Sequence, residues 1–163
     1  MSEGVLVRRA GPGDLATAGE VTVAAYSEFT LGPSDPYVER LRDAAARHRE
    51  AELWVAELDG EVVGTVTIAL VGSPWREIGT ADEGEFRMLA VAPAARGRGV
   101  GAALLTCVVD RFRGLGARGI VLSSLAEMTA AHRAYARLGF ERVPGRDWSP
   151  VPGIDLIAFR KEL

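Results

Sequence analysis

The order of strand-like and helix-like patterns along the chain is the feature that most limits its fold. A strand and two amphipathic helices come first, followed by two β-branched, apolar runs that meet at Asp59-Gly60, a dipeptide typical of tight hairpin turns. Strands are expected over residues 5–9, 53–58, 62–71, 85–91, 120–125, 141–143 and 154–161, and helices over 14–28, 37–50, 100–113 and 129–138. This order predicts an α/β fold in which one mixed, mostly antiparallel sheet of about seven strands is flanked by about four helices.

Local signals mark the ends of some of these elements. Asp14 precedes the first predicted helix and has a side chain that is preferred at the N-cap. The polar segment 72–84 contains Pro74 and Trp75 and follows neither period, so it is expected to be a loop. Loops of this length often carry function.

Composition limits the chain to one ordinary globular domain. Its 163 residues can bury one core but not two comfortable ones, so we expect a single domain over residues 1–163. The first residues lack a signal-peptide pattern, and no apolar stretch approaches the roughly 20 residues that span a bilayer, which favours a cytoplasmic protein without a membrane partner. The net charge of -3 gives no general attraction to nucleic acid. Cys107 is the only cysteine, so an internal disulfide or a thiolate metal cluster is excluded.

The segment Arg96–Ala102 carries the clearest functional signal, because it follows a predicted strand and opens a predicted helix. The first N–H groups of a helix lack internal partners and carry partial positive charge, so an anion there gains several hydrogen bonds. Gly99 and Gly101 remove the Cβ atoms that would stand between backbone and anion, while Arg96 and Arg98 add charge at the rim. The segment therefore predicts a pyrophosphate site.

Two other interpretations of this segment stay open. The turn could simply connect a strand to a helix and leave two arginines in solvent. Gly97-x-Gly99-x-x-Ala102 also fits a loose dinucleotide-binding fingerprint, with Glu127 as the ribose ligand. Against that fingerprint, several residues including Pro93 separate the turn from the strand, and Glu127 follows about 30 residues later rather than about 20.

Two motifs in the second half of the chain resemble those of one enzyme family. The pattern Arg96-x-x-Gly99-x-Gly101, after the strand Phe86-Arg87-Met88-Leu89-Ala90-Val91, resembles the acetyl-CoA signature of the GNAT superfamily of N-acetyltransferases. Residues 131–140, with a tyrosine four residues before Gly139-Phe140, resemble a later helix of that family. The resemblance runs from the first strand to Leu163 and is strongest over residues 85–140. It implies a three-layer sandwich with a cofactor cleft where two neighbouring strands diverge.

The resemblance also implies a reaction and a cofactor site. Such an enzyme transfers an acetyl group from acetyl-CoA to a primary amine of a small molecule or a peptide, by direct attack and without a metal. The backbone of three strand residues would bond the pantetheine arm, and the turn would hold the pyrophosphate. The implied cofactor-binding residues are Leu89, Ala90, Val91, Arg96, Gly97, Arg98, Gly99, Val100, Gly101 and Ala102. The acceptor amine is left open, and a homodimer is possible.

Tyr135 is the candidate acid for the leaving thiolate, because it falls on the family position that faces the cofactor sulfur. The alternative is a core tyrosine, since Met128, Ala131 and Leu138 share its helical face and its hydroxyl could bond to backbone. Both roles are compatible, because a packed ring is also a positioned one. Many family members have an asparagine where Met128 stands, so any amide contact at that position is in doubt.

Glu85 is the candidate general base, since some relatives with a similar strand use a glutamate there. Alternation places Glu85 on one face with Arg87 and Leu89, and the alternative role is a salt bridge to Arg87 or another cation. Asp82 and Glu83 are weaker candidates that could attract a cationic amine.

Other residues give weaker functional signals. Trp75 and Trp148 lie in predicted loops and could wall an acceptor pocket, although loop tryptophans more often pack onto the nearest apolar surface. The isolated His48 and His132 make no metal site. A rival function from another class is a non-catalytic acyl-CoA-binding domain that keeps the phosphate turn but lacks productive acid and base groups.

Overall fold

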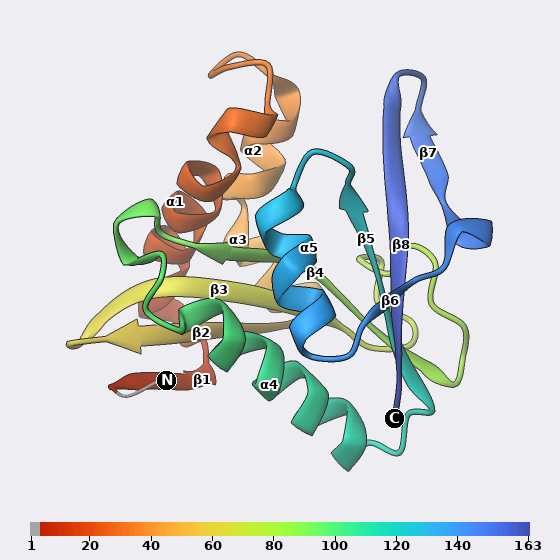
Figure 1. The fold of residues 1–163 in the computed structure, drawn as a ribbon. Coiled ribbons are helices and arrows are strands. Elements are labelled where there is room, and N and C mark those ends of the chain that lie inside the picture. The colour runs from red at the N-terminus through yellow and green to blue at the C-terminus, as the bar shows by residue number, and fades with distance from the viewer. Residues whose placement is uncertain (1–3) are drawn as a thin grey trace.

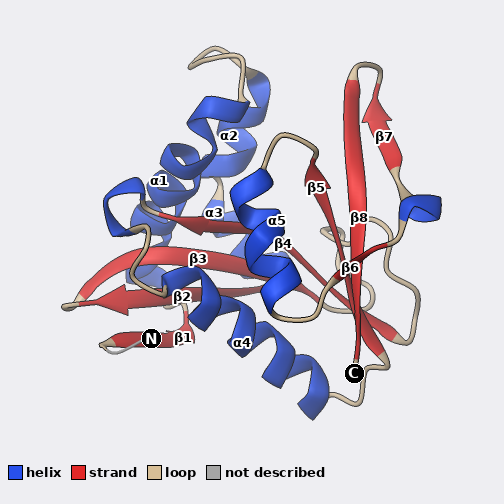
Figure 2. Ribbon diagram, in the orientation of Figure 1, coloured by secondary structure: helices blue, strands red, loops and turns tan. Residues whose placement is uncertain are grey.

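The fold is an α/β arrangement built on one sheet, as the sequence predicts (Figures 1 and 2). The computed structural model describes residues 4–163, which form eight strands and five α-helices. The strands are β1 (Val5–Arg9), β2 (Glu52–Leu58), β3 (Glu61–Ala69), β4 (Glu83–Val91), β5 (Gly119–Leu125), β6 (Glu141–Arg142), β7 (Trp148–Val151) and β8 (Ile154–Glu162). The α-helices are α1 (Leu15–Tyr26), α2 (Pro36–Arg42), α3 (Ala44–Glu50), α4 (Val100–Gly114) and α5 (Thr129–Arg137).

The strands lie in the order β1-β2-β3-β4-β5-β8-β6, and β7 pairs with β8. All of these pairs are antiparallel except β4 with β5, which are parallel. The helices α4 and α5 cover the face of the sheet that is turned to the viewer in Figure 1, and α1, α2 and α3 lie behind it. The largest buried cluster lies under α4 and α5, and smaller clusters lie under α1 to α3. The predicted mixed, mostly antiparallel sheet between two helical layers is therefore confirmed.

The single helix predicted over 37–50 is wrong, because the chain breaks at Asp43 into α2 and α3. The Asp43 carboxylate accepts the backbone N–H of Ala46 at 3.0 Å and so caps α3. The buried guanidinium of Arg47 donates to the carbonyls of Arg40 and Leu41, at 2.8 and 2.9 Å, and so closes the end of α2. Hydrogen bonds from side chains to the backbone compete with continuation of a helix. The amphipathic pattern continues across Asp43, so the pattern alone does not reveal the break.

Two other local expectations also differ from the structure. The side chain of Asp14 does not cap α1; its carboxylate accepts the N–H of Gly11 at 2.7 Å and pairs with Arg8 at 2.7 Å. The strand β7 was missed, because it is short and contains Pro150, which has no N–H to donate to a ladder. Within residues 4–163, no helix has the length and apolarity needed to cross a membrane.

Candidate active site

The strands β4 and β5 separate soon after they meet, and this divergence shapes the site. Their parallel pairing covers only Glu83–Glu85 on β4 and Gly119–Val121 on β5. Beyond Val121, β5 pairs with β8 alone, and the second half of β4 pairs with β3. The edge of β4 that carries Leu89, Ala90 and Val91 therefore opens toward a gap in the sheet.

A β-bulge at Met88 changes which side chains of β4 face which helical layer. Met88 has φ of 54°, and the register with β3 shifts opposite it. Phe86 packs under α4 and α5, whereas Met88 packs with Leu41 and Trp75 on the other face. Downstream of the bulge, Leu89 packs under α4 and α5 again. The expectation that Glu85 shares a face with Leu89 is therefore wrong, because simple alternation does not survive a bulge.

The turn from Arg96 to Gly101 has the geometry of an anion site. Gly97 and Gly99 adopt left-handed conformations, with φ of 80° and 82°, and Gly99 is the N-cap of α4. The backbone N–H groups from Gly97 to Ala102 form no hydrogen bond with any of residues 4–163. A Cβ atom built on Gly101 would meet only Val91, at 3.7 Å, so the space in front of these N–H groups is open. A run of free N–H groups at a helix start fits a diphosphate.

The arginines of this turn are exposed and only loosely held. Arg96 lies 3.7 Å from Glu28, and Arg98 lies 3.8 Å from Asp59, in solvent-exposed ion pairs. Pairs of this kind contribute little energy, so both guanidinium groups can turn toward an incoming anion at small cost.

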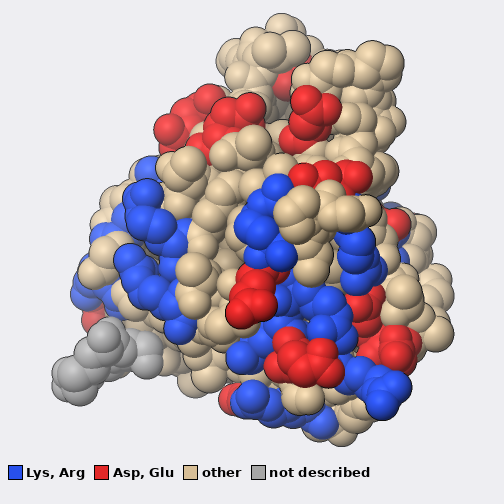
Figure 3. Space-filling view, turned by 45° about the vertical axis from the view of Figure 1, so that its right-hand side comes forward, with Lys and Arg blue, Asp and Glu red and all other residues tan. Residues whose placement is uncertain are grey.

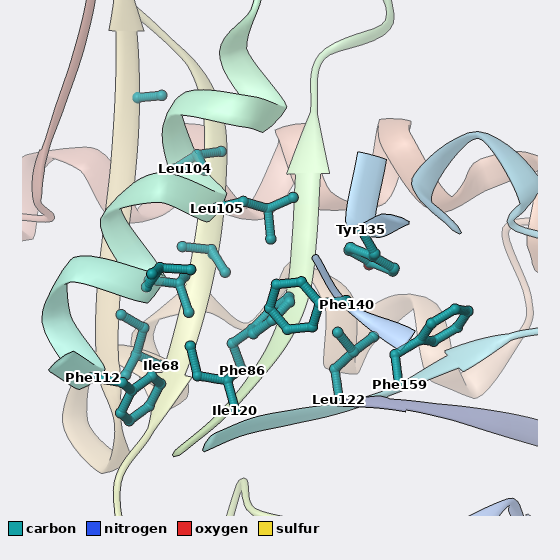
Figure 4. Packing of buried hydrophobic residues seen from close by; sticks show 14 of the residues in the cluster. Ile68, Phe86, Leu104, Leu105, Phe112, Ile120, Leu122, Tyr135, Phe140 and Phe159 are labelled. Carbon is teal, nitrogen blue, oxygen red and sulfur yellow. The ribbon is translucent and has the colours of Figure 1, made fainter. Parts of the chain in front are cut away.

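Tyr135 lies on the inner face of α5 within an aromatic cluster. Its ring is 6.0 Å from that of Phe86, 6.1 Å from Phe140 and 5.5 Å from Phe159, in edge-on or tilted arrangements (Figure 4). The residue is 5% exposed, and no hydrogen bond joins its hydroxyl to another of residues 4–163. Burial raises the pKa of the Tyr135 phenol, which keeps its proton in place at neutral pH. The ring is therefore fixed while the hydroxyl is left without a structural partner.

A second tyrosine, Tyr26 at the end of α1, reaches the same stretch of β4. Its hydroxyl donates to the carbonyl of Leu89 at 3.5 Å. Burial raises the pKa of Tyr26 well above its ordinary value, and the charge that Tyr135 would carry contributes in the same direction. No pattern in the sequence singles out this residue, since its position depends on how α1 packs against the sheet.

Glu85 is fully buried, and its carboxylate is bonded to the loop that precedes β4. Its two oxygens accept the backbone N–H groups of Glu77, Ile78 and Gly79, at distances from 2.8 to 3.4 Å. Arg87 pairs instead with Glu77, at 3.3 Å. The alternative role of a Glu85–Arg87 salt bridge is therefore not the one adopted, and the role of Glu85 as a base stays a prediction.

Glu83 is the centre of a buried charge network that joins three segments. Its carboxylate accepts from Arg146 at 2.8 Å, from Arg160 at 2.7 Å and from the backbone N–H of Thr80 at 3.1 Å. These bonds lower the pKa of Glu83 to about 2, with the bonds from Arg146 as the largest cause. Glu83 and the exposed Asp82 lie at the end of β4 that is opposite to Val91. The structure does not bring them together with the turn, and their contact with a substrate stays a prediction.

We expect Glu83→Gln to lower the free energy of unfolding by about 3 kcal/mol at pH 7, because it leaves Arg146 and Arg160 without their carboxylate. The folded-state pKa lies below the unfolded value, so this contribution is complete above about pH 5 and disappears as pH falls toward 2. Urea unfolding should therefore show a deficit that shrinks to about half at pH 3.

The matched control for this experiment is Glu162→Gln, which removes an exposed partner of the same Arg160. Its effect should stay below about 1 kcal/mol. If the free energy of unfolding fell equally in the two variants, the buried network around Glu83 would stabilise the fold no more than an exposed ion pair does.

Trp75 packs inward rather than lining an open pocket, which matches the structural alternative drawn from its loop position. It is buried, its indole N–H donates to Glu50 at 3.0 Å, and the guanidinium of Arg40 lies 4.4 Å from the ring centre. Trp148 starts β7, and its indole N–H donates to Ser123 at 2.9 Å. The role of Trp75 as a substrate contact stays a prediction.

The face shown in Figure 3 carries both signs of charge, with acidic side chains at the top, basic ones at the left and both kinds in the lower part. The face in that view therefore has no single sign that would attract a polyanion. Among residues 4–163, no three His, Cys, Asp or Glu side chains are grouped so that they could hold a metal ion.

Comparison with known proteins agrees with this geometry. The model of the Acetyltransferase (GNAT) family matches residues 20–140. The mycothiol acetyltransferase of Cellulomonas flavigena is 32% identical over 143 residues, which cover 75% of this chain and 40% of that protein. The chain therefore spans less than half the length of this curated relative.

Solved structures show the same fold at low identity. A GNAT-family acetyltransferase from Staphylococcus aureus superposes with a TM-score of 0.76 at 16% identity and covers 98% of this chain and 99% of its own. The PaiA N-acetyltransferase of Thermoplasma acidophilum, solved in complex with coenzyme A, has a TM-score of 0.72 at 16% identity, with 98% and 99% covered. The family match spans well over half of the sequence and contains both the divergent strands and the turn. The chain belongs to the GNAT family of acetyltransferases.

Proposed function

We propose that this chain is an acetyl-CoA-dependent N-acetyltransferase that acetylates a primary amine of a small molecule or a peptide. The observation that carries the proposal is the run of free backbone N–H groups from Gly97 to Ala102 at the start of α4. Family membership and the coenzyme A complex of the Thermoplasma protein support it. The gap between β4 and β5 leads away from this turn, along Val91 and Leu89.

The proposed chemistry assigns each group a task. Acetyl-CoA supplies a thioester carbonyl for attack by the amine. The turn holds the diphosphate through its free N–H groups, with Arg96 and Arg98 at the rim. The edge of β4 at Leu89, Ala90 and Val91 offers backbone groups to the pantetheine arm. Tyr135 gives its proton to the departing thiolate; burial raises the pKa of this phenol, so its proton is present at neutral pH. This scheme requires no metal.

An ammonium ion must lose a proton before it can attack, because its pKa lies near ~10 and its neutral form is scarce at pH 7. A carboxylate close to Arg87 on β4 could take this proton. Glu77 lies 3.3 Å from Arg87, and Glu85, the residue proposed from the sequence, accepts the backbone N–H of Glu77.

A screen of amines for CoA release tests the function. Amino acids, polyamines, N-terminal peptides and deacetylated mycothiol should be offered with acetyl-CoA, the last because of the name of the matched relative. We expect at least one to release free thiol in step with its own acetylation. Tight binding of acetyl-CoA without release from any amine would favour a non-catalytic acyl-CoA-binding domain. Preferential binding of NAD would favour the dinucleotide interpretation.

A further inference from the structure

The direction of the pantetheine arm along β4 indicates where the amine must be activated. This inference rests on the proposed acetyl transfer. An arm that starts at the turn passes Val91, Ala90 and Leu89 in that order, so its reactive end faces Met88 and Arg87. The groups that surround these two residues are therefore the ones that meet the acceptor.

One side of this position is closed. Beneath α4 and α5, the rings of Phe86, Tyr135 and Phe140 contact one another and are at most 5% exposed (Figure 4). A hydrated ammonium cannot enter such an apolar cluster without a large desolvation cost. The acceptor must therefore approach from the face that carries Arg87 and the loop before β4.

Two carboxylates belong to that side of β4, and the structure uses them differently. Glu85 is 0% exposed, and three backbone N–H groups occupy its oxygens. Both oxygens are therefore engaged by the loop backbone, and an ammonium from solvent has no open path to them. Glu85 therefore fixes the loop in place, and it does so at the backbone of Glu77.

Glu77 is held next to Arg87 but keeps free capacity. Its side chain is 15% exposed, and its carboxylate lies 3.3 Å from Nε of Arg87. No N–H group of residues 4–163 hydrogen-bonds this carboxylate. It can therefore accept a proton from a group that enters beside Arg87.

We infer that Glu77 is the general base that takes the proton from the acceptor ammonium, and that Glu85 is a positioning residue that holds Glu77 beside Arg87. An N–H bond of the ammonium breaks and an O–H bond forms on Glu77. The nitrogen lone pair then forms the N–C bond, the C–S bond breaks, and the thiolate receives the proton of Tyr135. A second proton passes from the nitrogen to water as the amide forms. Glu77 then gives its proton to water, the phenolate of Tyr135 takes one back, and one proton is released overall.

The electrostatics around Glu77 support this role. The charged groups that face it are Arg87 and Glu85 from β4 and Arg40 from α2. Burial raises the pKa of Glu77, Arg87 and Arg40 oppose the rise, and the charge of Glu85 adds to it. A base works best when its pKa lies near the working pH, so a raised carboxylate pKa favours proton abstraction.

The decisive measurement is the pH dependence of kcat/KM for Glu77→Gln with the best amine from the screen. At pH 7 we expect a fall of about 100-fold, because general bases typically contribute about 10² to 10⁴. The variant depends on amine that is already neutral, so its rate should rise about tenfold per pH unit toward the amine pKa near ~10. The deficit should therefore shrink with rising pH, and Glu77→Asp should recover part of the rate.

Two further variants separate this role from a structural one. Glu85→Gln should lower kcat at all pH values but keep the acidic limb of the profile, because Glu77 is still present. Glu20→Gln breaks an exposed glutamate–arginine pair with Arg42 and should leave the rate unchanged.

The outcomes distinguish this inference from the function beneath it. Suppose that the parent releases CoA with an amine. If kcat/KM of Glu77→Gln then equals that of Glu20→Gln, or is lower than the parent value by the same factor at every pH, Glu77 is not the base. The acetyltransferase function would still stand. If Glu85→Gln rather than Glu77→Gln loses the acidic limb, the base is Glu85. A parent that acetylates no amine would remove the function and, with it, the role of Glu77.

Discussion

Gly101→Leu is expected to weaken acetyl-CoA binding about 1,000-fold while the protein stays folded. A Cβ atom at this position meets Val91 at an ordinary contact distance of 3.7 Å, but the rest of a leucine side chain would occupy the space in front of the free N–H groups. Charge-assisted hydrogen bonds contribute about 1.5–3 kcal/mol each, so the loss of two gives roughly 4 kcal/mol, or about three powers of ten. Isothermal titration with acetyl-CoA measures this directly.

The matched control is Gly114→Leu, at the other end of the same helix, where a Cβ atom would meet nothing within 4 Å. Both variants replace a helical glycine and should unfold at the same or slightly higher urea concentration than the parent. If Gly101→Leu bound acetyl-CoA as tightly as Gly114→Leu does, the anion site at the start of α4 would have to be abandoned. The proposed function would then lose its main support.

Tyr135→Phe is expected to lower kcat about 1,000-fold with little change in stability. The substitution keeps the ring among Phe86, Phe140 and Phe159 and removes a hydroxyl that bonds to no other described residue. The loss falls within the range of about 10² to 10⁴ that general acids contribute. Steady-state CoA release gives kcat, and thermal unfolding shows whether the core has changed.

The exposed Tyr37 on α2 provides the control, since Tyr37→Phe removes a phenol hydroxyl from the helical layer on the other side of the sheet. Because burial raises the pKa of Tyr135, the parent should not lose activity through its ionisation below about pH 10. A Tyr135→Phe enzyme within a few-fold of the parent would leave the tyrosine a packing role only.

Patterns that are local in sequence predicted most of this fold. The hairpin at Asp59-Gly60 and the strand and helix around the turn follow from neighbouring residues, and each is confirmed. The break at Asp43 could not be predicted, because an aspartate is found both on the exposed face of a helix and at a helix N-cap. The missed strand β7 needs β8 to pair with, so a short run with Pro150 gives little signal by itself.

The candidate site divides in the same way. The run of glycines and arginines could be recognised because an anion site at a helix start uses consecutive residues. The contacts of Glu85, Glu77 and Tyr26 depend instead on how a loop and α1 pack against the sheet. No periodicity encodes them, and the role of Glu85 as a base, which came from the family resemblance, stays a prediction.

The bulge at Met88 has a consequence for anyone who redesigns the acceptor preference of this protein. It exchanges the odd and even positions of β4, so the side chains that point toward α1, α2 and α3 are Glu85 and Arg87 before it and Ala90 after it. A mutant library laid out as a regular strand would vary Leu89, which points into the opposite layer. Libraries should therefore shift the alternation by one residue after Met88. Deleting a residue at the bulge would move each side chain of the following cofactor segment to the opposite face of the sheet.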